Sequence, residues 1–192
     1  MRRAVTLLLL TVLGIAAQPK EKPLWLDAAP KQWNKPGANI PRGQKLVSDD
    51  DEFMRKQCLP GVRQPMTPEA RAVVARGWML VIETHDNRGI SVVTGMENFD
   101  GMCRPTRYQD FVFVNGRYAG TLSPALMDSR TDGASIRAAF PDPGKIYAEF
   151  ERYSVRDPLC CPSRVSEAMF EIRDTGGKPV VALVSVRTRP TN

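Results

Sequence analysis

The residues best suited to polar chemistry gather in one short loop. Asp128, Arg130 and Asp132 place two carboxylates and a guanidinium close together in the chain, and Arg152 is a further cation that could reach them. Such a set could line a polar ligand pocket or serve hydrolysis. The same residue types commonly bond to nearby backbone, so a loop that braces itself is the alternative.

Serine and histidine form no recognisable catalytic pattern. The chain has no Gly-x-Ser-x-Gly sequence, and its one histidine, His85, lies in a Thr-His-Asp-Asn turn. It also has no phosphate loop, dinucleotide fingerprint or EF-hand spacing. Catalysis needs a base and a nucleophile within hydrogen-bond reach. We therefore predict no catalytic residue and no cofactor, with a hydrolase built on residues 128–132 as the alternative.

The four cysteines, Cys58, Cys103, Cys160 and Cys161, could form disulfides or bind a metal. Zinc sites favour C-x₂₋₄-C spacing and histidine ligands, and that spacing is absent, so we predict structural disulfides and no metal site. A bond between neighbouring cysteines closes a strained ring, whereas ordinary disulfides need Cβ atoms that converge freely. We expect Cys160 and Cys161 each to pair with one of the other two, in either arrangement.

Residues 1–17 have the order of a secretory signal peptide. Arg2 and Arg3 precede a run of 14 apolar or small residues, and Gln18 follows at once. A membrane anchor is the alternative, but a spanning helix needs about 20 apolar residues. We predict cleavage after Ala16 or Ala17 and export to the periplasm or the extracellular space. The mature chain is then expected to have no transmembrane segment, in a compartment that allows disulfides.

The positive charge of the chain lies mostly at its front. Residues 18–48 hold six Lys and Arg against two acidic residues, whereas residues 49–192 hold nineteen of each sign. Because a nucleic-acid-binding domain carries clustered basic residues on its fold, we expect no nucleic-acid partner. The basic segment could be attracted to an anionic membrane or wall polymer, or it could be a solvated linker.

Residues 18–48 contain five prolines and few large apolar side chains, so they are predicted to form an extended Pro/Lys-rich linker. Trp25 and Trp33 are the exceptions, and could dock on the domain or on a partner. A single disulfide-stapled domain is predicted over residues 49–192, a length that suits one core.

Alternation of apolar and polar residues predicts an α+β domain, mainly an antiparallel β-sheet of six to eight strands with one or two N-terminal helices. Thr67 before Pro68 is a helix start signal, and Asn115-Gly116 is a hairpin turn. We expect residues 97–109 to be rich in turns. Helices are expected over 53–56 and 67–77, and strands over 78–84, 90–94, 111–114, 117–121, 134–139, 145–153, 168–173 and 180–187.

The hairpin over residues 111–121, FVFVNGRYAGT, resembles the hairpin of the LppP/LprE-type bacterial envelope lipoproteins. Residues 145–153 and 169–173 are similar to the strands that follow in that family, so the resemblance covers about 75–175. The chain lacks the family's lipid-attachment cysteine. The resemblance implies an extracytoplasmic, non-enzymatic envelope protein of bacterial type and brings no catalytic residues.

The leading interpretation is an exported protein that binds an unknown envelope component or a small ligand. The possible ligand-binding residues are Asp128, Arg130, Asp132 and Arg152. A hydrolase is one alternative, and a purely structural wall-associated protein with exposed Trp25 or Trp33 is another.

Overall fold

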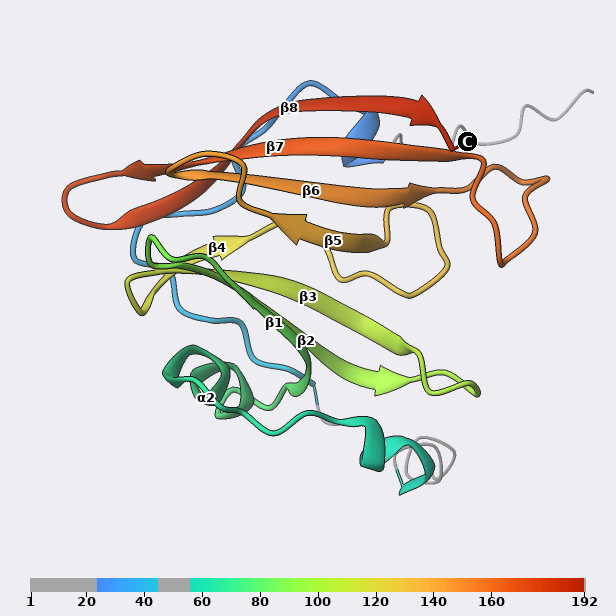
Figure 1. The fold of residues 1–192 in the computed structure, drawn as a ribbon, viewed down its shortest axis with the longest axis horizontal. Helices are drawn as coiled ribbons and strands as arrows, with labels where there is room; N and C mark the ends of the chain where they lie inside the picture. The colour runs from blue at the N-terminus through green and yellow to red at the C-terminus, as the bar shows by residue number, and fades with distance from the viewer. Residues whose placement is uncertain (1–23, 45–55, 192) are drawn as a thin grey trace, which may run out of the picture.

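The computed structural model describes residues 24–44 and 56–191, and within them eight strands form two four-stranded antiparallel sheets (Figure 1). The first sheet has the order β1-β2-β3-β4 and the second the order β5-β6-β7-β8. The predicted signal peptide at 1–17 lies outside the described residues, as does most of the helix expected over 53–56.

The described elements follow one another along the chain. They are η1 (Trp25–Asp27), η2 (Leu59–Gly61), α2 (Pro68–Val74), β1 (Met79–His85), β2 (Ile90–Phe99), β3 (Pro105–Val114), β4 (Arg117–Thr121), β5 (Ser135–Ala139), β6 (Lys145–Arg152), β7 (Arg164–Asp174) and β8 (Pro179–Pro190).

The predicted number of strands and their antiparallel pairing are confirmed, but the strands divide between two sheets instead of forming one. Alternation within a strand does not reveal which neighbour it pairs with. The division falls at the long connection between β4 and β5, residues 122–134. Within each sheet, all consecutive strands pair with one another in antiparallel hairpins.

The sequence signals for the start of helix α2 and for the β3–β4 hairpin turn are confirmed. Thr67 caps α2 by accepting a hydrogen bond from the Ala70 amide at 3.2 Å, and Pro68 begins the helix. Asn115 and Gly116 both have positive φ, 47° and 76°, as a type I′ hairpin requires.

The expectation of turns over residues 97–109 is confirmed only for residues 100–104, because β2 continues to Phe99 and β3 begins at Pro105. The two strands pair across this region, with Met96 opposite Tyr108 and Asn98 opposite Thr106. Pairing between the two strands keeps these polar residues in an extended conformation. Local composition does not predict this pairing.

The main core lies between the two sheets. From β6, the side chains of Ile146, Ala148 and Phe150 point into it and have no exposed surface. From β2, Val92 points into the same core while its neighbour Val93 points to the opposite face, as the period of two in a strand requires.

A smaller core covers the other face of the first sheet. The short helix α2 places Val73 there, and Trp78 stacks edge-on against Phe111 with ring centroids 5.0 Å apart. Phe113 completes this layer. The first sheet is therefore buried on both faces, with α2 below it in Figure 1 and the second sheet above it.

The described part of the predicted linker, residues 24–44, lies against the domain. Trp25 packs edge-on against Phe150 and against Trp33, with centroids 5.1 and 5.3 Å apart. Leu26 is buried, with 4% of its surface exposed. The segment is extended, as its prolines favour, but apolar side chains spaced along it give it enough buried surface to dock. The domain boundary at residue 49 stays a prediction.

Asn34 joins the two sheets where β4 meets β8. Its side chain accepts a hydrogen bond from the Thr121 amide at 2.9 Å and donates to the carbonyls of Thr121 and Val181, both at 3.0 Å. Trp33 also donates to the Thr121 carbonyl, at 3.2 Å. The N-terminal segment thus closes this side of the sandwich, and β1 and β5 are left as the edge strands of the other side.

The expected cysteine pairing is wrong. Cys58 is bonded to Cys103, with Cα atoms 5.2 Å apart, and Cys160 is bonded to Cys161. Cys58 lies beside the turn between β2 and β3, which carries Cys103. The other two cysteines lie in the loop between β6 and β7 of the second sheet. Because each of the four cysteines is bonded to another partner, the cross-pairing that we expected does not occur.

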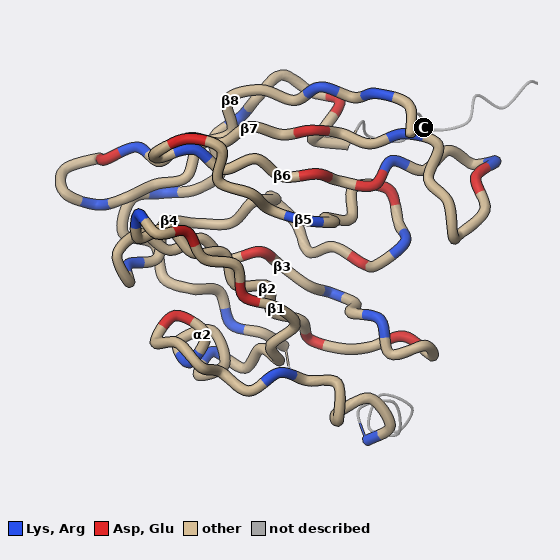
Figure 2. Tube along the Cα trace, viewed as in Figure 1, with Lys and Arg blue, Asp and Glu red and all other residues tan. Residues whose placement is uncertain are grey.

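Charged residues of both signs are interspersed along the described trace (Figure 2). On the outer face of the second sheet Glu149 accepts from Arg137 at 3.0 Å and lies 3.6 Å from Arg189. This face is therefore a network of paired charges and not a surface of one sign.

Candidate functional site

Asp128 and Arg130, two of the residues predicted to line a polar pocket, bond mainly to neighbouring segments of the protein. Asp128 accepts a hydrogen bond from the Arg107 amide at 2.7 Å, and its carbonyl accepts from the Thr131 hydroxyl at 2.7 Å. Arg130, with a φ of 61°, donates to the carbonyl of Leu159 at 3.1 Å. These contacts connect the loop before β5 to its neighbours.

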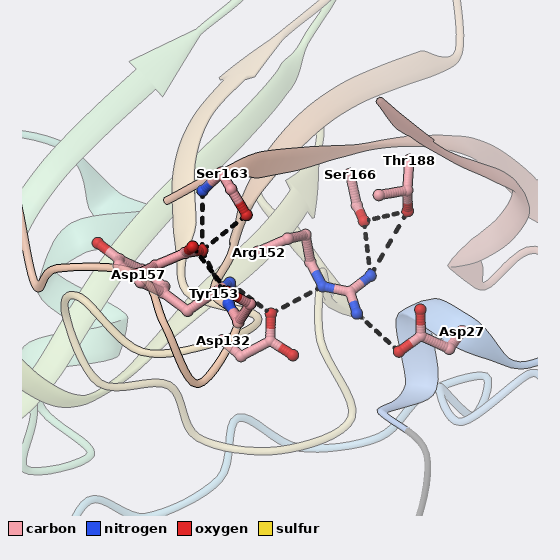
Figure 3. Close-up of polar contacts among 9 residues, drawn as sticks. Asp27, Asp132, Arg152, Tyr153, Asp157, Ser163, Ser166 and Thr188 are labelled. Carbon is pink, nitrogen blue, oxygen red and sulfur yellow. Dashed lines mark hydrogen bonds and ion pairs between the residues drawn. The ribbon is translucent and has the colours of Figure 1, made fainter. Parts of the chain in front are cut away.

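Asp132 and Arg152 meet in a second cluster, inside the end of the sandwich (Figure 3). The side chain of Arg152 is only 2% exposed, and its Nε donates to Asp132 at 2.8 Å while Nη2 donates to Asp27 at 2.6 Å. Nη1 donates to the hydroxyl of Ser166 at 2.9 Å. The arrangement ties η1, β6 and β7 together.

Each nitrogen of the Arg152 guanidinium donates to a protein group, Nε to Asp132, Nη1 to Ser166 and Nη2 to Asp27. Burial opposes its charge, but the hydrogen bonds that it donates to Asp27 and Asp132 outweigh that effect and raise the pKa of Arg152. The charge is thus held permanently, and the cluster serves as an internal clamp on the N-terminal segment.

Asp157 organises the loop that carries the adjacent cysteines. Its carboxylate accepts from the amides of Ser154 and Ser163 at 2.8 and 2.9 Å, and from both hydroxyls at 2.7 Å (Figure 3). These bonds, beginning with the Ser154 amide, lower the pKa of Asp157. The loop is therefore held by local polar contacts.

His85 lies at the end of β1, away from the groups discussed above. Its Nε2 is 3.2 Å from the Glu83 carboxylate, and its side chain is 41% exposed. Among residues 24–44 and 56–191, no group of three or more His, Cys, Asp or Glu could hold a metal ion. His85 and Glu83 therefore form no catalytic arrangement with residues 128–132 in the described structure.

A hollow in the part of the chain that the structure describes lies between the sheets on the side of β1 and β5. It has a volume of about 310 Å³, which is within the range of small-molecule sites. Its apolar wall comes from the side chains of both sheets. These are Val81, Ile82, Val92, Ile136 and Ala138.

A buried carboxylate forms the polar wall of this cavity. Asp110 of β3 is 5% exposed, and its Oδ1 accepts from the Thr94 hydroxyl at 2.6 Å. Tyr108, two residues earlier on the same face, donates from its hydroxyl to the Ser135 carbonyl at 3.0 Å, across the gap between the sheets. These polar groups lie on otherwise apolar walls, as is typical of ligand sites.

Burial raises the pKa of Asp110, and the hydrogen bonds from Thr94 and Ser135 oppose this rise only in part. Burial is also the main cause of the raised pKa of Tyr108, with the Asp110 carboxylate adding to it. None of the ion pairs found among the described residues involves Asp110. A carboxyl group in a cavity whose pKa is raised by burial is a functional-site candidate.

A second hollow of about 300 Å³ adjoins the first and is more open to solvent. It shares Tyr108, Ser135 and Ile136 with the first and adds Arg130 and Cys160. Of the four ligand-binding residues predicted from the sequence, Arg130 is thus the one that lines a hollow found in the described chain. Asp128, Asp132 and Arg152 are held in the contacts described above.

Sequence reasoning missed Asp110, Thr94 and Tyr108. The available signal was a charged residue at an inward position of a strand, since Asp110 alternates with Phe111 and lies between Tyr108 and Val112 on one face. The expectation of turns up to residue 109 hid that pattern, because it placed the start of the strand after Asp110.

Replacing Asp110 by asparagine is expected to stabilise the protein relative to the wild type by an amount that grows with pH. The folded chain holds the Asp110 proton to higher pH than the unfolded chain, whose aspartates titrate near about 3.9. This difference in pKa stabilises the folded wild-type protein fully below the pKa of the unfolded chain. The stabilisation is lost as the pH rises through the raised pKa of the folded chain. Asparagine keeps an acceptor for Thr94 and does not ionise.

Urea denaturation of both proteins, from about pH 4 upward, measures this difference. The exposed Asp142, which pairs with Lys145 at 3.2 Å, is the matched control through Asp142→Asn. A difference between Asp110→Asn and wild type that stays flat with pH contradicts the prediction.

A comparison with protein-family models matches residues 83–175 to the LppP/LprE lipoprotein family. This confirms the resemblance inferred from the hairpin. The match begins within β1 and ends just after β7, so it includes Thr94, Asp110 and Ala138 of the cavity but neither Cys58 nor α2. No curated protein and no solved structure matches the chain at a significant level.

The lipoprotein family is associated with the cell envelope, and its role is not known. Over the described residues, no helix combines the length and the hydropathy that crossing a membrane requires.

Proposed function

We propose, from the premise that residues 83–175 match the LppP/LprE lipoprotein family, that this chain is an exported envelope protein that binds a small ligand without transforming it. The cavity between the sheets is the binding site. The observation that carries the proposal is a volume of about 310 Å³ with mainly apolar walls and one buried carboxyl group.

The fold supports binding at this position. The opposite side of the sandwich is closed by β4, β8 and the side chain of Asn34. On the cavity side, Ile82 and Ile136 are 44% and 52% exposed, so apolar side chains from both sheets reach the surface there. A ligand entering between them buries this apolar surface, which favours binding.

The alternative of a hydrolase built on residues 128–132 finds less support. Asp128 accepts from the Arg107 amide, and Asp132 accepts from Arg152 and from the Tyr153 amide at 2.9 Å. Both carboxylates are therefore bonded to protein donors. In the described structure, the hydroxyls of Ser129 and Thr131 donate to backbone carbonyls, so neither is a nucleophile paired with a base.

Ala138→Phe is expected to abolish binding of an uncharged apolar dye such as N-phenyl-1-naphthylamine. Ala138 lines the cavity and is partly buried against the main core, so a phenyl ring there occupies ligand volume. The next residue, Ala139, is exposed and does not line the cavity, so Ala139→Phe adds the same ring outside the site.

Fluorescence titration of the wild type and the two variants gives the result. The proposal requires that the wild type and Ala139→Phe bind the dye, and that Ala138→Phe binds it at least about tenfold more weakly. A loss of this size corresponds roughly to the loss of one region of apolar contact. Equal binding by Ala138→Phe and Ala139→Phe contradicts the cavity as the site.

A further inference from the structure

The polar wall of the cavity offers hydrogen-bond acceptors and a negative charge, with few free donors. Five hydroxyls line this cavity, and four of them, those of Thr94, Tyr108, Ser129 and Ser135, are bonded inside the protein. Thr94 donates to Asp110 at 2.6 Å, Tyr108 to the Ser135 carbonyl at 3.0 Å, and Ser129 to the Pro105 carbonyl at 2.7 Å.

The carboxylate itself has acceptor sites to spare. An ionised carboxylate can accept about four hydrogen bonds, and the bonds to Asp110 come from the hydroxyls of Thr94 and Ser135. A ligand group that only accepts hydrogen bonds therefore finds few donors here, whereas a group with several N–H donors finds an acceptor in Asp110.

Charge favours the same class of ligand. Asp110 is 5% exposed, and no lysine or arginine in the described chain is paired with it. Arg137, the one cation in the cavity lining, pairs at 2.9 Å with Glu149. A buried carboxylate without a cation is costly, and a bound cation with hydrogen-bond donors removes that cost.

Resting on the proposed function, we infer that the ligand of the cavity is an organic ammonium ion, with its N–H donors on Asp110 and its apolar body against Val92 and Ala138. An aromatic side chain beside the carboxylate adds to this preference, since Tyr108 lines the same wall and aromatic rings attract cations. Ile136 covers the outer part of the apolar body.

Calorimetric titration with octylamine, octanol and octanoate tests the inference, because the three probes share one alkyl chain and differ in the head group. At neutral pH octylamine carries an ammonium group. It is expected to bind the wild-type protein roughly tenfold more tightly than octanol, or better, as a charged hydrogen bond provides. Octanoate is expected to bind most weakly, because its charge repels Asp110.

Two variants locate the effect. Asp110→Asn is expected to remove the preference, so that octylamine and octanol bind this variant with similar affinity. Glu151→Gln is the matched control, since Glu151 lines only the adjoining hollow, and it is expected to leave the ranking of the probes unchanged. The wild-type ranking by itself tests the inference if a variant does not fold.

The possible failures are distinguishable. Equal binding of octylamine and octanol, tighter binding of octanoate, or loss of the preference in Glu151→Gln alone overturns the inference and leaves the cavity as a binding site. Failure of all three probes to bind, together with failure of the uncharged dye, overturns the proposed function itself.

Discussion

Replacing Cys58 and Cys103 together by serine is expected to lower the free energy of unfolding by about 4 kcal/mol. The disulfide closes a loop with a sequence separation of 45 residues, and the loss of unfolded-chain entropy for a loop of that length corresponds to about 4 kcal/mol. Cys58 is 2% exposed and packs in the main core, so its environment tolerates little rearrangement.

The second disulfide is the matched control. Cys160 and Cys161 are adjacent in the chain and exposed, so their bond closes almost no loop, and replacing both by serine is expected to change stability by less than about 1 kcal/mol. Urea denaturation of the wild type and the two double variants measures both effects. Equal losses in the two variants contradict the pairing described above.

A non-reducing peptide map of protein from its native compartment tests the pairing directly. A linked peptide pair that contains Cys58 and Cys103 is expected, with Cys160 and Cys161 in one unlinked peptide. The same map reports the N-terminus, and a terminus after Ala16 or Ala17 is expected for the exported protein. Cross-linked peptides that join Cys58 to the Cys160 loop contradict the expected pairing.

Removing the negative charges around Arg152 is expected to cost about 3 kcal/mol. The double variant Asp27→Asn with Asp132→Asn keeps hydrogen-bond acceptors but leaves a guanidinium that is 2% exposed without an anionic partner. An isolated buried charge costs about 3–5 kcal/mol. We expect the lower end of that range, because Asp27 and Asp132 are 43% and 37% exposed and solvent screens their charges.

A third substitution separates the buried charge from general disruption. Adding Arg152→Met to the double variant removes the unpaired cation and is expected to recover a large part of the lost stability, measured by urea denaturation. Asp142→Asn, at an exposed pair, is expected to change stability by less than about 0.5 kcal/mol. A triple variant that is less stable than the double variant contradicts this account of the clamp.

The cluster around Arg152 contains a contact of the N-terminal segment that local sequence does not predict. Residues 24–44 have the proline content of a linker, and nothing local announces that Asp27 meets Arg152, which is 125 residues away. The same holds for Asn34, whose partners are backbone groups of β4 and β8. Composition describes the conformation of such a segment but not the surface on which it docks.

The sequence alone determined the features that arise from neighbouring residues. The cap at Thr67, the hairpin at Asn115-Gly116, the alternation that produces eight antiparallel strands and the family resemblance all depend on contacts or patterns within a few positions. Only the tertiary structure decided the division into two sheets, the partner of each cysteine and the cavity beside Asp110. Each of these depends on which distant segments meet, and that choice is made by burial over the whole chain and not by local conformational preference.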